Sequence, residues 1–190
     1  MNNYSFDQLI GKKVLIVGDL DSGKVKLLAS LLDEAIMQGF ERKITLIDMA
    51  PMEIEFEIGE QKIGGLVEEY SNNLERIRNL TPRRVYAPRI EAKEKKDVVK
   101  LSARNARNIG DQIREFKVWP TKILFINDIT FYLHQGPLAI VQKAIGKSHT
   151  FIGTGYRGNF PVDDFDTGIS RTEKKLIDKL TTSMDDVITL

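Results

Sequence analysis

Short apolar runs alternate along the chain with longer stretches in which apolar residues recur every three or four positions. The short runs are apolar at successive positions, which is typical of strands buried on both faces. We predict such strands over 13–17, 43–48, 84–87, 122–127 and 149–152. The longer stretches predict amphipathic helices over 24–38, 94–116, 137–145 and 170–180. Alternating strands and helices predict an α/β fold, a three-layer sandwich with a mostly parallel sheet of about five strands and helices on both faces.

Two segments depart from this alternation. Between 52 and 66, Ile54, Phe56 and Ile58 alternate with glutamates, which indicates a β-ribbon with one exposed face, inserted into a single domain that spans 1–190. A second local signal lies near the C-terminal end, where Ser170 and Glu173 have the spacing of a capping box. This spacing predicts that the last helix begins there.

Composition narrows the chemistry that the chain can carry. The 190 residues include 28 basic and 27 acidic side chains, two histidines and no cysteine. The missing thiols exclude disulfides and cysteine nucleophiles, and two histidines leave little for a zinc site. A net charge of +1 does not support nucleic acid as a partner. No signal peptide or membrane-spanning run is evident, so we expect a cytoplasmic protein without a membrane partner.

The first predicted strand continues into Gly18-Asp19-Leu20-Asp21-Ser22-Gly23-Lys24-Val25. Gly, four residues and Gly-Lys form the P-loop, or Walker A, pattern. The glycines permit close backbone approach, successive N–H groups form a cup for phosphates, and the following helix adds its positive end. Lys24 would reach the β- and γ-phosphates of a nucleotide. The position after a buried strand and before an amphipathic helix favours this function over an ordinary glycine-rich turn.

Val25 departs from the pattern, which has Ser or Thr there to ligate Mg²⁺. Valine has nearly the shape of threonine but no hydroxyl. Two interpretations follow: water and an acidic residue elsewhere hold Mg²⁺ in a working enzyme, or the site binds nucleotide and turns it over poorly.

Two acidic residues end predicted strands and are candidates for the metal site. Asp128 follows the apolar run 123–126, which is the Walker B form, and we expect it to orient Mg²⁺. Asp48 ends the second strand, and ligands in such sheets bind at the carboxyl ends of strands. Asp48 is therefore a candidate general base or second metal ligand, with an ordinary strand-end aspartate as the alternative.

Arginines and a glycine-rich segment are further candidates. Arg89, just after the third predicted strand, could neutralise charge at the γ-phosphate, or it could be a solvated surface residue. For Arg104 and Arg107 a solvated helix face is the better interpretation. The glycine-rich residues 153–158 predict a turn after the fifth strand, which could contact the base or ribose of a nucleotide or could be a flexible loop.

The stretch from Val14 to Pro51, with Asp21-Ser22-Gly23-Lys24 and Asp48, resembles the opening of the Clp1/Grc3-like polynucleotide kinases and of the MinD/SIMIBI ATPases. Taken whole, with residues 126–128 and 168–171, the chain is similar to archaeal P-loop ATP-binding proteins that carry no assigned activity. These resemblances imply ATP rather than GTP as the nucleotide, with Mg²⁺ as cofactor.

The sequence thus leads to two hypotheses. The first is an ATPase or kinase-like phosphotransferase, in which Lys24, Asp48 and Arg89 act on the nucleotide and Asp128 and Asp48 serve the metal. The second is a nucleotide-dependent regulatory module with weak turnover, whose partner is another protein or a second copy of the chain.

Overall fold

The computed structural model of the chain describes residues 4–52, 54–55, 62–63, 65–158 and 164–190. Its main sheet has six strands in the order β5-β2-β6-β7-β1-β8, and every neighbouring pair is parallel. The strands are β1 (Lys13–Gly18), β2 (Ile44–Asp48), β5 (Arg78–Asn79), β6 (Ile123–Asn127), β7 (Thr150–Tyr156) and β8 (Asp186–Thr189). The predicted α/β architecture is confirmed, with one more strand than expected.

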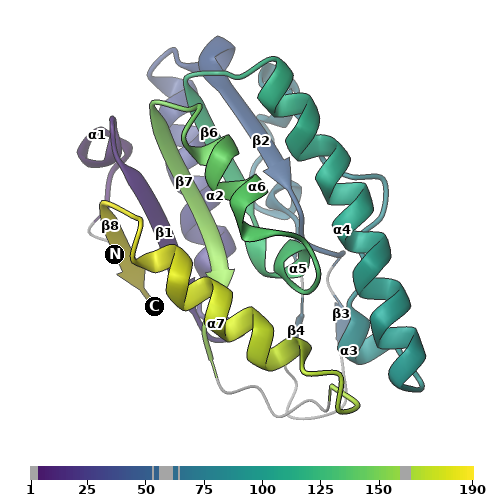
Figure 1. Cartoon of the computed structure of the whole chain (residues 1–190). Helices are drawn as coiled ribbons and strands as arrows, with labels where there is room; N and C mark the ends of the chain where they lie inside the picture. Colours follow the sequence, from purple (N-terminus) through teal and green to yellow (C-terminus); the bar gives the residue numbers. More distant parts are fainter. Residues whose placement is uncertain (1–3, 53, 56–61, 64, 159–163) are drawn as a thin grey trace.

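Helices cover both faces of this sheet (Figure 1). The α-helices are α1 (Phe6–Leu9), α2 (Lys24–Met37), α3 (Pro88–Glu91), α4 (Lys95–Val118), α5 (Ile129–Leu133), α6 (Leu138–Ile145) and α7 (Ile169–Thr181). Three short 3-10 helices are η1 (Glu41–Lys43), η2 (Val67–Glu69) and η3 (Leu74–Arg76). In Figure 1, α4, α5, α6 and α7 lie on the near side of the sheet, and α2 lies behind it. Among the described residues, no helix is both long enough and apolar enough to cross a membrane.

The core consists of two apolar clusters, one on each face of the sheet. Within β1, Leu15 and Val17 belong to the cluster under α4–α7, whereas Val14 and Ile16 belong to the cluster under α1 and α2. A strand that contributes to both layers must be apolar at successive positions, which explains the pattern in the sequence.

A separate antiparallel pair, β3 (Ile54–Glu55) with β4 (Lys62–Ile63), lies within the segment 52–66 where a ribbon was expected. The remainder of that prediction, residues 53, 56–61 and 64, lies outside the described residues.

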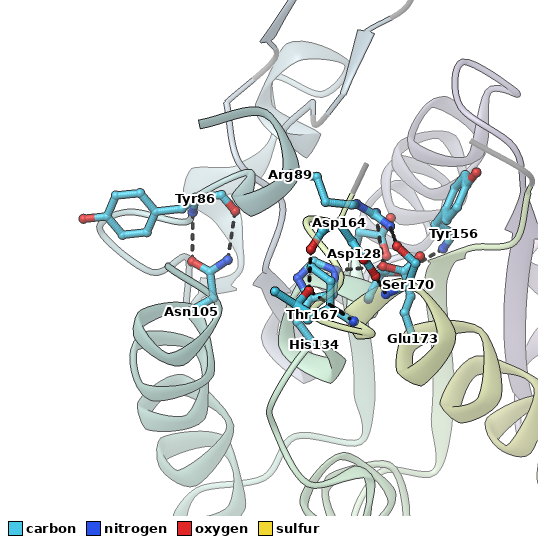
Figure 2. A network of polar contacts seen from close by, with 12 residues as sticks. Tyr86, Arg89, Asn105, Asp128, His134, Tyr156, Asp164, Thr167, Ser170 and Glu173 are labelled. Atoms are coloured by element: carbon cyan, nitrogen blue, oxygen red, sulfur yellow. Dashed lines mark hydrogen bonds and ion pairs between the residues drawn. The ribbon is translucent and has the colours of Figure 1, made fainter. Parts of the chain in front are cut away.

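The strand predicted over 84–87 is wrong. Those residues are irregular, and the strand that pairs with β2 on the side away from β6 is the two-residue β5. Val85 and Ala87 are apolar because they pack into the core. The backbone N–H and carbonyl of Tyr86 bond to the side-chain amide of Asn105, both at 2.8 Å, in place of a neighbouring strand (Figure 2).

Two other local predictions also need correction. Residues 153–156 were expected in a loop, but they form the end of β7, where both faces are buried. There the glycines allow close packing, since a Cβ on Gly155 would lie 2.8 Å from Cδ1 of Ile177 in α7. The last helix begins one residue before Ser170, with Gly168 as its N-cap at φ 75°, so the predicted capping box does not form.

Candidate functional site

The loop between β1 and α2 has the backbone form that its glycines predict. Gly23 is the N-cap of α2 with φ 87°, a left-handed conformation that glycine adopts without strain. Gly18 is needed for a different reason, because a Cβ there would lie 2.6 Å from both the Leu190 carbonyl oxygen and Ser22 Oγ. The loop therefore leads directly into the first turn of a 14-residue helix, whose N–H groups have no partners within the helix.

Lys24 folds back over this loop. Its side chain is largely buried, and its ammonium group donates to the Asp19 carbonyl and to Ser22 Oγ, the latter at 3.3 Å. Burial lowers the pKa of Lys24, while the carboxylates of Asp128, Asp19 and Asp21 act in the opposite direction. The lysine is thus held beside the loop in a place where a bound phosphate could replace its backbone partner.

A cavity of about 360 Å³ opens above the loop. Residues 20–26 form one wall, and Asn127 and Asp128 at the end of β6 form another. Arg89, Tyr70 and Tyr156 are also among its lining residues. The structure thus brings together residues 20–26, Asp128 and Arg89, which the sequence predicted to share one site.

Asp128 is anchored at the edge of this cavity. It caps α5, since its Oδ1 accepts the Thr130 N–H at 2.9 Å. Burial raises the pKa of Asp128, and the nearby Lys24 ammonium opposes that rise. Asp128 is half-buried beside the loop between β1 and α2. Its carboxylate is a type of donor that Mg²⁺ uses, because protein sites for Mg²⁺ combine one or two carboxylates with phosphates and water.

Val25 lines the cavity and also packs, partly buried, against the apolar cluster of α1 and α2. It offers no oxygen to a metal. Within the described residues, no group of three or more His, Cys, Asp or Glu side chains is arranged to hold a metal ion. Any magnesium at this site would therefore depend on Asp128, on water and on the nucleotide's own phosphates.

Asp48 reaches the same edge of the sheet, but it does not line the cavity. Its side chain is buried, and its oxygens accept the Val67 N–H at 2.7 Å and the Asn127 amide at 2.9 Å. The side-chain oxygen of Asn127 in turn accepts a hydrogen bond from the Thr154 hydroxyl at 2.8 Å. Burial raises the pKa of Asp48 to about 7. Asp48 is thus part of a buried network that joins the ends of β2, β6 and β7.

Arg89 lies on the short helix α3 rather than after a strand, and it belongs to a buried ionic group (Figure 2). Its guanidinium lies 3.1 Å from Glu173 Oε2 and donates to Ser170 Oγ at 3.2 Å. The same Glu173 oxygen lies 2.7 Å from His134 Nε2. Both Glu173 and His134 are almost fully buried, and His134 Nδ1 has no hydrogen-bond partner among the described residues.

Sequence reasoning assigned neither Glu173 nor His134 to this site. One signal pointed to Glu173. It lies on the same face of α7 as the buried apolar residues Ile169, Ile177 and Leu180, where an apolar residue would be expected. An acid at such a position is buried and therefore needs a partner. Nothing in the sequence indicated that His134 would meet it.

No protein-family model matches the chain, and a search of curated proteins finds no significant relative.

Proposed function

We propose that the chain binds a nucleoside triphosphate, ATP by preference, together with Mg²⁺, and that it hydrolyses or transfers the γ-phosphoryl group. One observation carries this proposal: the P-loop with Lys24 and the carboxylate of Asp128 face a single cavity of about 360 Å³. A loop with a cation and a half-buried acid in the same cavity match the two charges of a magnesium–triphosphate complex.

The residues divide the task between them. The N–H groups of residues 20–25 and the Lys24 ammonium would bind the β- and γ-phosphates. Asp128 would hold Mg²⁺ directly or through water, and the metal would supply neutralising charge on the phosphate oxygens. Arg89 also lines the cavity and could neutralise charge that develops on the transferred group.

Asp48 has a different role in this proposal from the one expected of it. A general base must lie within hydrogen-bond reach of the proton that it removes. Asp48 is buried, is absent from the cavity wall and accepts the Asn127 amide instead. We therefore treat Asp48 as a positioning residue, which fixes Asn127 directly before Asp128.

The second candidate function is a nucleotide-dependent regulatory module with slow turnover. The packing of Val25 against the apolar cluster favours it, because the usual hydroxyl ligand for Mg²⁺ is replaced by a side chain that cannot bind the metal. In that case the bound nucleotide would control a partner, another protein or a second copy of the chain.

Nucleotide binding is tested by calorimetry with ATP and Mg²⁺. We expect Lys24→Ala to weaken ATP binding by about 10- to 100-fold, because it removes a charged donor to phosphate. Lys143→Ala is the matched control, since Lys143 is exposed in the last turn of α6. If Lys24→Ala binds ATP as tightly as the unmodified chain, both candidate functions are wrong.

Turnover then separates the two candidates. Hydrolysis that depends on Mg²⁺ in the unmodified chain, and is lost in Asp128→Asn, supports the enzyme. A low rate that rises strongly in Val25→Thr supports the regulatory module, because the new hydroxyl restores the missing ligand.

A further inference from the structure

A second cavity adjoins the P-loop cavity. Its volume is about 570 Å³, and it shares Arg89 and Tyr156 with its neighbour. The remaining wall comes mainly from α7 and from the residues just after β7. The size is in the range of cavities that enclose a small molecule.

Four basic and two acidic side chains line this second cavity, namely Arg89, Arg157, Arg171, Lys174, Glu173 and Asp178. Two of the cations are already paired. Arg89 lies 3.1 Å from the buried Glu173, and Arg157 Nε lies 3.3 Å from Asp178 Oδ1. The cavity thus has two basic side chains in excess.

Arg171 and Lys174 supply that excess. They are three positions apart on α7 and therefore lie on neighbouring parts of one helix face. Both are exposed, and within the described part of the chain no carboxylate lies at ion-pair distance from either of them. The helix N-terminus does not add to this charge, because Asp164 accepts the Ser170 N–H at 3.1 Å. The positive field in the cavity therefore comes from side chains.

The charge and the shape together favour a phosphomonoester. At neutral pH this group carries between one and a half and two negative charges and three acceptor oxygens, which balances the excess of two cations. Arginine also matches the geometry of phosphate with paired N–H donors. Ile177 and Tyr156 add apolar surface for the body of the ligand.

We propose that this second cavity binds a small phosphomonoester, held by Arg171 and Lys174. The site needs no nucleotide in the P-loop cavity. If the proposed function holds, Arg89 and Tyr156 are the wall shared by the two ligands, so the phosphomonoester lies beside the nucleotide as a second substrate or effector.

The test uses ribose 5-phosphate as the phosphomonoester and ribose as its neutral counterpart. Binding is measured by calorimetry and by amide chemical shifts in NMR spectra. We expect ribose 5-phosphate to bind, ribose not to bind, and the signals of α7 to shift. Because the attraction is largely electrostatic and the site is open, affinity should fall as salt increases.

The double variant Arg171→Gln/Lys174→Gln should weaken ribose 5-phosphate binding by at least about tenfold, through loss of two charged donors. Lys175→Gln is the control, because Lys175 is exposed on the same helix but does not line the cavity. Lys24→Ala should leave this binding unchanged even where it abolishes ATP binding, so the two proposals can fail separately.

Three results would overturn the inference. The first is equal affinity of the double variant and the unmodified chain. The second is loss of binding in Lys24→Ala, which would place the phosphate in the P-loop. The third is no binding of ribose 5-phosphate at millimolar concentration and low salt.

Discussion

The buried carboxyl group of Asp48 leads to a specific prediction about how the stability of the fold depends on pH. Burial raises the pKa of this carboxyl from 3.8 to about 7, although the Val67 N–H and the Asn127 amide both oppose that rise. The folded chain therefore holds a proton that the unfolded chain releases at much lower pH. The perturbation that isolates this proton is Asp48→Asn, which cannot titrate.

The sign and the size follow from proton linkage. Wherever the folded state binds more protons than the unfolded state, the free energy of unfolding decreases as pH rises. The contribution of Asp48 is therefore fully present below 3.8 and is lost as pH rises through about 7. Between about pH 5 and about pH 8, the loss amounts to about 2–3 kcal/mol.

The assay is urea unfolding of both proteins across this pH range. We expect the unmodified chain to lose about 2–3 kcal/mol more than Asp48→Asn between the two ends. Other titrating groups, such as Asp128, are present in both proteins and cancel in the comparison. Asp7→Asn serves as the control because Asp7 is exposed on α1.

A direct measurement tests the same prediction if the Asp48→Asn variant is too unstable to study. The carboxyl carbon of Asp48 can be titrated by NMR in the unmodified chain, where we expect a midpoint near 7. The reasoning is refuted if Asp48 titrates near its ordinary value, or if both proteins show the same dependence of stability on pH.

Two further predictions concern packing and the buried ionic group. Gly155→Ala should lower the free energy of unfolding by about 1–3 kcal/mol, because the new Cβ would lie 2.8 Å from Ile177 in α7. At Gly146 the φ is −64° and a Cβ would lie 3.4 Å from the Gln142 carbonyl oxygen, so Gly146→Ala should change the free energy of unfolding by less than about 1 kcal/mol in the same urea assay. Glu173→Ala should cost about 3–5 kcal/mol, because Arg89 would lose its partner in a buried site, and Glu173→Gln should cost less. Equal stability of Glu173→Ala and the unmodified chain would show that the ionic group does not stabilise the fold.

The sequence predicts best where local pattern and burial coincide. β1, β2 and β6 are buried on both faces, so most of their residues are apolar, and the structure places each strand within one residue of its prediction. Where burial arises without a strand, the same reasoning fails. Val85 and Ala87 are buried, but the Asn105 side chain, 19 residues from Tyr86, satisfies the Tyr86 backbone in place of a ladder.

The site shows the same division between local and distant information. The predicted P-loop rests on spacing alone, and the interest in Asp128 rests on its place at a strand end, since both signals lie in consecutive residues. Asp48 is held away from the cavity partly by its hydrogen bond with the Val67 N–H, 19 residues later in the chain. Arg89 forms its ion pair with Glu173, which lies in the distant helix α7. No short-range pattern records such contacts, so the sequence could suggest candidates but could not separate those in the cavity from those beneath it.

The position of β1 in the sheet has a consequence for synthesis. β1 is synthesised well before both of its neighbours in the sheet, β7 and β8, and Val14 pairs with Asp186. The strand that leads into residues 18–25 therefore has no partner in the sheet until β7 has left the ribosome. Pairings over such separations form slowly. A nascent chain that stops before β7 would contain the complete P-loop motif, but β1, the strand before that motif, would have no neighbouring strand to fix its position.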